Sequence, residues 1–78
     1  MYDIGRFAQK GEMMDLVSIG KRLKELRGNK TQKEVSEGIG IAQSTYAMYE
    51  TGKRRASDEN KIRIARYYKK SVQSIFYA

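Results

Sequence analysis

Residues 31–50 read TQKEVSEGIGIAQSTYAMYE, and the spacing of apolar side chains in this stretch decides the fold. With Gln32 taken as the first position, the fourth, eighth, tenth, fifteenth and eighteenth positions are apolar: Val35, Ile39, Ile41, Tyr46 and Tyr49. The fifth position is the small Ser36 and the ninth is Gly40. Two helices that cross steeply over a tight turn need this pattern, because the second helix packs directly on the fifth position. The stretch therefore predicts two short helices joined by a tight turn.

Capping residues mark the limits of the first of these helices. Thr31 and Glu34 have the spacing of a capping box, so this helix is expected over residues 32–37. The sequence GIG at residues 38–40 is expected to break the helix. Gly40 is assigned to the turn, because a tight turn needs a residue that is free of Cβ strain.

The second helix of the pair is expected to begin at Ala42 or Gln43 and to end at Glu50, where Thr51-Gly52 closes it. Its tyrosines, Tyr46 and Tyr49, are assigned to the core. The remaining side chains are expected to face away from the core: Gln43, Ser44, Ala47 and Met48.

The segment that precedes this pair predicts one more helix. Leu16, Ile19, Leu23 and Leu26 follow one another at spacings of 3, 4 and 3 residues, which is one stripe of a helix. Gly28-Asn29 is expected to end it, because both residues adopt a positive φ readily. Residues 1–14 show poor periodicity and are expected to form a loosely ordered or non-native N-terminal arm, with a short helix as the alternative. Residues 15–78 are expected to form the domain.

Two further helices are predicted after the pair. Ser57 is expected to cap a fourth helix that carries acidic residues in its first turn. We assign the inner face of this helix to Ile62, Ala65 and Tyr68 or Lys69, with Ile64 beside it. Ser71 is expected to cap a short fifth helix that carries Val72, Ile75 and Phe76. No segment alternates long enough to indicate a strand. The sequence thus predicts an all-α fold, a compact five-helix bundle.

Composition narrows the function. The 78 residues allow one domain, and they contain no cysteine, histidine or proline. A thiolate zinc site, a disulfide and a cysteine nucleophile are therefore excluded, and the commonest general base is missing. No paired carboxylates or nucleophile–base arrangement is evident. We expect no enzymatic activity, no cofactor and no metal.

Charge points to a polyanionic partner. The net charge is +7, and residues 18–78 contain 14 basic and 6 acidic side chains, a net of +8. Nucleic acid and an acidic membrane surface both fit such a charge. No run of apolar residues reaches the 18 or so of a membrane span, and the N-terminal residues do not resemble a secretory signal. We expect a cytoplasmic protein that is associated with the nucleoid when bound to DNA, and no membrane partner.

Three segments, IGKRLKELR, TQKEVSEGIGIAQSTYAMYETGK and IRIARYYKKSVQSIF, resemble the Cro/phage-repressor-type (Xre-like) helix-turn-helix regulators. The resemblance covers about residues 18–78 and implies a lambda-repressor-like five-helix domain that binds double-stranded DNA. It departs from the usual family pattern at four places. The turn after Arg27 is about two residues shorter, Ser36 replaces alanine, Ala42 replaces a capping serine or threonine, and Ala56 stands where proline is typical.

The resemblance also assigns roles to residues. In the family, the third helix enters the major groove and its first residues meet base edges. The positions that match here are Gln43, Ser44, Thr45 and Met48. Phosphate contacts are assigned to Gln32, Lys53, Arg54 and Arg55. The helix at 43–50 has no lysine or arginine, so affinity is expected to come from basic residues elsewhere while this helix discriminates between bases.

The resemblance further implies an ion pair between Arg27 and Glu50, which we assign to structure rather than to DNA contact. It implies a transcriptional regulator, expected to be a repressor of phage or mobile-element type that binds a two-fold operator as a homodimer. The dimer would form through the fifth helix, through the N-terminal arm or on DNA. The alternative is a protein-interaction module of the same fold, an antitoxin or anti-repressor. An exposed apolar patch formed by residues 1–17 with Ile75, Phe76 and Tyr77 would favour that alternative.

Overall fold

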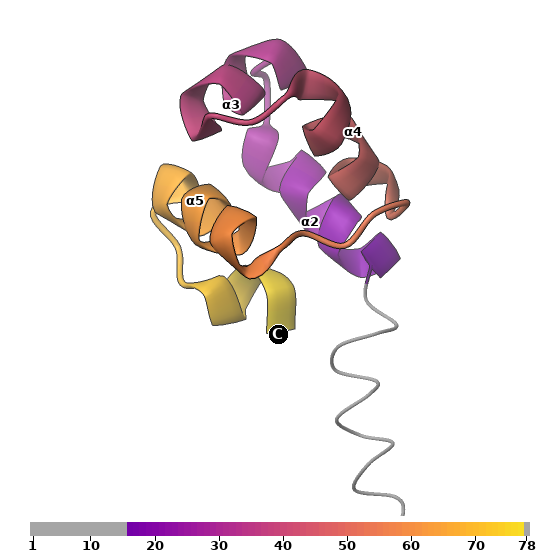
Figure 1. Ribbon diagram of the computed structural model, residues 1–78, viewed down its shortest axis with the longest axis vertical. Coiled ribbons are helices and arrows are strands. Elements are labelled where there is room, and N and C mark those ends of the chain that lie inside the picture. The colour runs from indigo at the N-terminus through magenta and orange to yellow at the C-terminus, as the bar shows by residue number, and fades with distance from the viewer. Residues whose placement is uncertain (1–15, 78) are drawn as a thin grey trace, which may run out of the picture.

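The computed structural model describes residues 16–77, and this part of the chain folds into helices without a strand (Figure 1). In chain order the elements are α2 (Leu16–Arg27), α3 (Gln32–Ile39), α4 (Gln43–Thr51), α5 (Asp58–Tyr68) and the π-helical turn η1 (Gln73–Tyr77). The predicted all-α bundle with a helix-turn-helix is confirmed. The predicted N-terminal arm, residues 1–14, lies outside the described residues.

The capping box at the start of α3 is formed as expected. Thr31 Oγ1 accepts a 3.0 Å hydrogen bond from the Glu34 amide, and the Glu34 carboxylate accepts one of 3.0 Å from the Thr31 amide. The turn residue is Gly40, with φ of +94° in the left-handed region. The prediction that α3 breaks at residues 38–40 was wrong by two residues, because α3 continues to Ile39.

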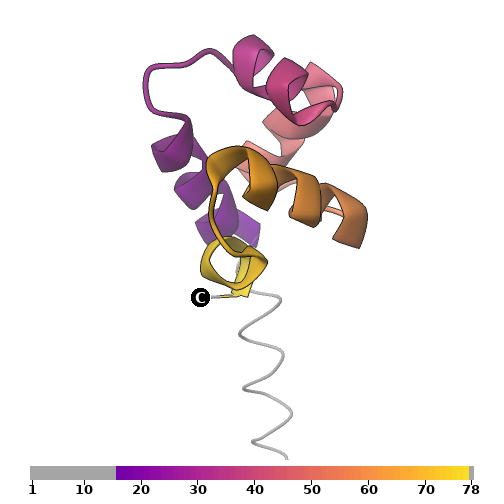
Figure 2. The same ribbon diagram turned by 90° about the vertical axis from the view of Figure 1, so that its left-hand side faces the viewer.

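Gly38 stays in the helix because it makes room for Tyr67. A Cβ atom at Gly38 would lie 2.4 Å from Cε1 of that ring, which is far inside van der Waals contact. The glycine therefore serves the packing of α3 on α5, and Gly40 alone makes the turn. Figure 2 shows α3 above α5, with η1 below.

The core lies where α2 and α4 pack together with α3, α5 and η1. Its fully buried side chains include Leu23, Val35, Tyr46, Ile64 and Ile75. Ser36 is also buried, as the small fifth position of the helix pair requires. Gly20 lets α2 approach α4 very closely, since a Cβ there would lie 2.2 Å from the Glu50 carbonyl oxygen. This close approach holds the helix-turn-helix pair on α2.

The inner face of α5 differs from the predicted one. Ile62 is 49% exposed, whereas Lys61, Ile64 and Ala65 are buried. Lys69 is not on the inner face either, because it ends α5 in the left-handed conformation with φ of +59°. Ala65 is buried and Tyr68 packs against the core, as predicted, but Lys61 takes the inner position that was predicted for Ile62. The aliphatic part of Lys61 packs inward, which an apolar-spacing argument does not anticipate.

The C-terminal turn packs into the core. Ser71 Oγ accepts a 3.0 Å hydrogen bond from the Ser74 amide, as predicted for a cap, and Arg22 donates to the carbonyl of Ile75. Of its three large apolar or aromatic side chains, Ile75 and Phe76 are buried and Tyr77 is exposed. The apolar patch that was to favour a protein-interaction module is therefore not formed by η1. None of the helices within residues 16–77 has the length and apolar character needed to cross a bilayer.

Candidate nucleic-acid interface

The first turn of α4 presents polar side chains to solvent while its tyrosines anchor it. Gln43 and Ser44 are exposed, and Tyr46 and Tyr49 are buried. Ala42 precedes the helix without a side-chain hydrogen bond to it, and the first turn contains no acidic residue. Among residues 16–77, Ala42 thus leaves the first amide groups of α4 and the positive end of its dipole without a side-chain cap, which suits a negatively charged or hydrogen-bond-accepting partner.

The other two predicted base contacts are less open. Thr45 and Met48 are both half-buried, at the border between the exposed face and the core. A half-buried side chain at this border presents part of its surface outward. The structure thus places Gln43 and Ser44 fully on the outer face, and Thr45 and Met48 at its edge.

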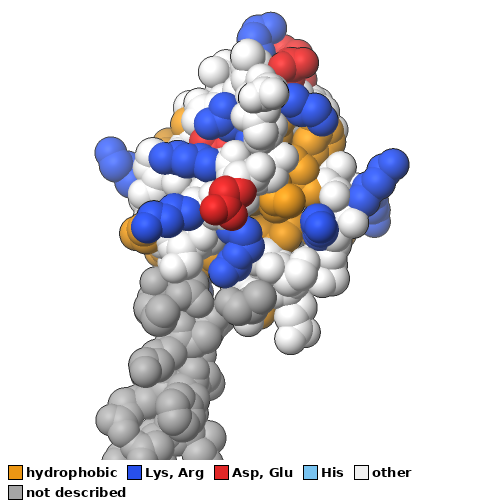
Figure 3. All heavy atoms as spheres, turned by 180° about the vertical axis from the view of Figure 1, so that it is seen from behind, with side chains coloured by type: hydrophobic (Ala, Val, Ile, Leu, Met, Phe, Trp, Pro, Cys, Tyr) orange, Lys and Arg blue, Asp and Glu red, His pale blue; other side chains and the backbone are white. Residues whose placement is uncertain are grey.

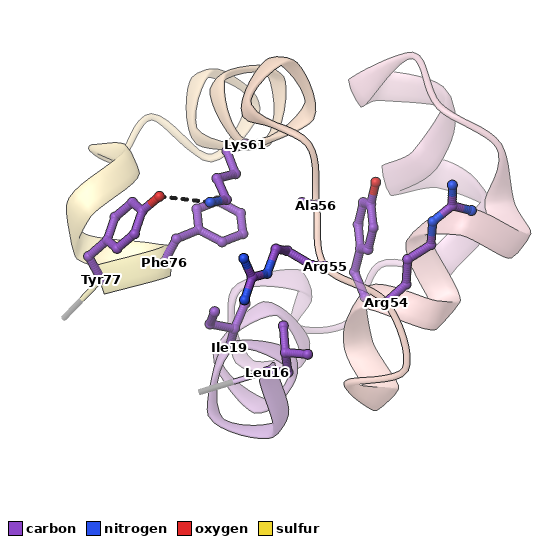
Figure 4. A pocket seen from close by; sticks show the side chains of 9 residues that line it. Leu16, Ile19, Arg54, Arg55, Ala56, Lys61, Phe76 and Tyr77 are labelled. Atoms are coloured by element: carbon purple, nitrogen blue, oxygen red, sulfur yellow. Dashed lines mark hydrogen bonds between the residues drawn. The ribbon is translucent and has the colours of Figure 1, made fainter. Parts of the chain in front are cut away.

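The basic loop follows directly from α4. Gly52 ends the helix with φ of +76°, and a Cβ there would lie 3.1 Å from Cα of Val17, so the turn rests against the start of α2. Residues 53–55 are exposed, and the buried Ala56 fixes the far end of the loop. In the close view, the Arg54 side chain lies on the α4 side of the loop, whereas Arg55 turns toward α2 and η1 (Figure 4). The loop therefore places its two arginines in different surroundings.

Gln32 is tied to α4 by its side chain. Its Nε2 donates a 2.9 Å hydrogen bond to Oε1 of Glu50. The side chain of Gln32 is thus engaged within the protein, and the phosphate contact predicted at this residue is one through the backbone N–H groups at the start of α3. A phosphate contact at this residue would have to use the backbone N–H, which has no partner within the helix in the first turn of α3.

Arg27 and Glu50 form the ion pair that the resemblance implied. Arg27 donates through Nε to Oε2 at 2.7 Å and through Nη2 to Oε1 at 3.0 Å, and the Glu50 side chain is 0% exposed. Burial alone would raise the pKa of Glu50, but the hydrogen bonds from Arg27 and Gln32 outweigh it and lower that pKa. The hydrogen bond to Glu50 raises the pKa of Arg27. The C-terminal end of α4 is therefore held to both α2 and α3.

The tyrosines of α4 hold its middle in place. The Tyr46 hydroxyl is 2.8 Å from the Tyr68 hydroxyl and 3.4 Å from the Leu23 carbonyl oxygen, and burial raises the pKa of Tyr46. Asn60 Nδ2 donates a 2.9 Å hydrogen bond to the Tyr49 hydroxyl. These contacts link α4 to α2 and to α5, so the first turn projects from a fixed base.

Sequence reasoning missed two contacts that position this surface, the close packing at Gly20 and the hydrogen bond from the Gln32 side chain. Gly20 lies inside a helical stripe, and an isolated glycine there is a signal for close packing. The hydrogen bond from Gln32 to Glu50 left no signal in the sequence, because it depends on how two helices meet. Both residues act on the end of α4 that is opposite to Gln43.

Basic side chains outnumber acidic ones in the described part of the chain. Residues 16–77 contain the same 14 basic and 6 acidic side chains as residues 18–78. On the face turned away in Figure 1, lysine and arginine side chains are spread around an apolar area rather than gathered into one cluster (Figure 3). The excess of positive charge favours attraction to a polyanion, and on this face no single cluster of basic side chains marks where a polyanion would bind.

Comparison with known proteins bears on this surface. Residues 21–75 match the model of a protein family described as helix-turn-helix. The match contains α3, the turn, α4, the basic loop and α5 in full. No curated protein and no solved structure gives a significant match to the chain.

Proposed function

We propose that this chain, which belongs to the Cro/repressor-type helix-turn-helix family of DNA-binding regulators, is a repressor. In this proposal it binds a two-fold symmetric operator as a dimer. One observation carries the proposal. The first turn of α4 exposes Gln43 and Ser44 on a helix whose opposite side is anchored by buried tyrosines. That arrangement fits insertion of the start of a recognition helix into the major groove.

The side chains of this turn fit base edges in different ways. Gln43 has the amide that pairs bidentately with N6 and N7 of adenine, and Ser44 donates or accepts one hydrogen bond. Thr45 and Met48, at the edge of the face, offer a methyl group and a thioether to a thymine methyl group. We expect Gln43 to contribute most to discrimination between sequences.

Phosphate contacts would hold the helix in register. Lys53, Arg54 and Arg55 are exposed on the loop that continues from α4, and the backbone N–H of Gln32 lies at the start of α3. Arg54 is the cleanest of these to test, since it lies on the α4 side of the loop (Figure 4). Arg54→Ala should weaken binding to all sequences alike and reduce the salt dependence by about one unit of slope. A loss restricted to the cognate site would contradict a phosphate role.

A dimer is proposed because one small domain makes few contacts with DNA. Two copies bound to half-sites about one helical turn apart double the contacts, and the operator is then two-fold symmetric. Sites selected by the protein from a random duplex library test this directly. Inverted half-sites at a spacing of about one turn support the dimer, and a single unrepeated half-site contradicts it.

The repressor role needs a separate experiment. A promoter that carries the selected site over its start region is fused to a reporter gene, and expression is measured with and without the protein. Lower expression with the protein supports repression, whereas higher expression identifies an activator. A promoter with a scrambled site serves as the matched control.

A further inference from the structure

The turn between α3 and α4 leads directly into the helix that is proposed to read bases. The backbone N–H groups of Gly40 and Ile41 both donate to the Ser36 carbonyl, at 2.8 Å and 3.0 Å, and these bonds fasten the turn to the end of α3. On the side of α4, Ala42 adds no side-chain hydrogen bond. A local cap therefore does not help to hold the first turn of α4 in place.

One side chain of α5 reaches this turn. Arg63 donates from Nη1 to the Gly40 carbonyl oxygen at 3.3 Å and from Nη2 to Oε2 of Glu59 at 2.8 Å. Glu59 precedes Arg63 by four residues, the spacing at which a carboxylate and a guanidinium on one helix meet. The guanidinium is planar and presents its donors in a fixed fork. The carboxylate that holds one arm of the fork therefore also aims the other arm at Gly40.

The groove between α3 and α5 contains a second arginine, which allows a direct comparison. Arg63 and Arg66 both line this groove, together with Gly38, Ile39 and Tyr67, and both arginines are exposed. Figure 2 shows the two helices of the groove, with α3 above α5. The two arginines bring the same charge to the same groove, but Arg63 is the one that donates to the turn.

We propose that Arg63 is a positioning residue for sequence reading, because by holding Gly40 it keeps the first turn of α4 in the orientation that base edges require. This inference rests on the proposed function, and Gln43 begins α4 three residues after Gly40. Base edges demand a defined orientation, whereas phosphate contacts carry no sequence information. A turn that is held beforehand saves the ordering cost of binding the operator.

The contact should matter for orientation more than for global stability. The side chains of Arg63 and Glu59 are 44% and 72% exposed, and ion pairs this open add little to the free energy of unfolding. A change in the behaviour of the turn can therefore be measured in a chain that remains folded.

The first test uses the full chain without DNA. Hydrogen exchange of backbone amides is followed by NMR in the unaltered chain, in Arg63→Met and in Arg66→Met. Methionine keeps an unbranched side chain of similar helix propensity but has no N–H donor. In Arg63→Met, the amides of Ile41 and Tyr46, which are hydrogen-bonded in and next to the turn, should exchange about threefold to tenfold faster.

The amides of α2 should keep their exchange rates in both variants, and Arg66→Met should leave the turn unchanged. Unchanged exchange at Ile41 and Tyr46 in Arg63→Met would overturn the proposal. An equal acceleration in Arg66→Met would overturn it too, because the effect would then come from the charge of the groove and not from the contact with Gly40.

The second test measures affinity for the selected operator and for random duplex by fluorescence anisotropy. Each substitution removes one positive charge from the same groove, so general attraction to DNA should fall by a similar factor in Arg63→Met and Arg66→Met. The ratio of operator affinity to random-duplex affinity should fall by about threefold to tenfold in Arg63→Met and stay unchanged in Arg66→Met. An unchanged ratio in Arg63→Met, or the same fall in both variants, would contradict a positioning role.

The two tests separate this inference from the proposed function. If the unaltered chain prefers no duplex sequence, the proposed function fails, and the reading role of Arg63 fails with it. Hydrogen exchange still decides in that case whether Arg63 holds the turn. If the unaltered chain selects an operator and the ratio does not respond to Arg63→Met, the proposed function stands and the positioning role is rejected.

Discussion

The two ends of α4 are built in opposite ways. At its C-terminal end the Glu50 carboxylate is fully buried and receives hydrogen bonds from Arg27 and Gln32. At its N-terminal end Ala42 supplies no cap, and Gln43 and Ser44 are exposed. The C-terminal end of α4 is therefore its saturated end, because the carboxylate there has its hydrogen-bond partners inside the protein. The N-terminal end is its open end, because the polar side chains there face solvent.

This difference teaches how tertiary contacts at one end of a short helix can fix the orientation of an exposed turn at its other end. A nine-residue helix is only marginally stable by itself, so its orientation has to come from tertiary contacts. The buried ion pair and the close approach of Gly20 to the Glu50 carbonyl supply those contacts away from the exposed turn. The side chains that would meet bases therefore need no structural role, and they are available for recognition.

The largest expected effect comes from breaking the saturated end. Arg27→Ala leaves the Glu50 carboxylate buried without its guanidinium partner, so the free energy of unfolding should fall by about 3–5 kcal/mol. Urea unfolding followed by circular dichroism measures it. Arg66→Ala, at an exposed arginine of α5, is the matched control and should change stability by less than about 0.5 kcal/mol. Equal losses in the two variants would show that the ion pair does not hold α4.

The pH dependence of stability isolates the charge on Glu50. Its pKa is lowered in the folded chain, because the hydrogen bonds from Arg27 and Gln32 outweigh the effect of burial. A carboxyl group of this kind contributes full stability above its unfolded pKa and loses that contribution as the pH falls through its folded pKa. Urea unfolding between neutral pH and about pH 3 should therefore show less acid destabilisation in Glu50→Gln than in the unaltered chain. Identical pH profiles would contradict the direction of the shift.

The opposite end of α4 should respond in binding and not in folding. Gln43→Ala removes an exposed amide, so stability should hardly change, while affinity for the selected operator should fall by about 1–3 kcal/mol. Fluorescence anisotropy with the operator and with random duplex measures both affinities. Gln73→Ala, an exposed glutamine on η1, is the matched control and should leave both unchanged. Equal weakening on operator and random duplex would reject a base-reading role for Gln43.

The sequence carried more information about the open end of α4 than about the saturated end. Apolar spacing and the capping box located the helix pair, because both depend on residues within one or two turns. The pairing of Gln32 with Glu50 depends on side chains 18 positions apart meeting across two helices, and no local pattern records it. The resemblance to a family supplied the Arg27–Glu50 pair, which spacing alone does not contain.

The same difference between local patterns and contacts between helices explains why two predictions from the sequence were wrong. The inner face of α5 was misassigned because Ile62 and Ile64 are equally apolar, and the buried aliphatic chain of Lys61 decides between the two registers. Gly38 was assigned to a break because glycine weakens helices, yet the ring of Tyr67 requires a residue without a side chain there. In both cases a contact with another helix overrode the local preference.

The smallest predicted effect concerns the missing cap. Ala42→Ser supplies a hydroxyl that can accept a hydrogen bond from an amide in the first turn of α4, and it should raise the free energy of unfolding by about 1 kcal/mol. Ala47→Ser makes the same change in the middle of this helix, where serine is a poorer helix former than alanine, so it should lower stability slightly. Urea unfolding of the two variants side by side gives the comparison. If the free energy of unfolding rises in Ala42→Ser alone, the missing cap at the start of α4 costs the protein stability. If it changes equally in both variants, solvent already satisfies the hydrogen bonds of the first turn, and the prediction is contradicted.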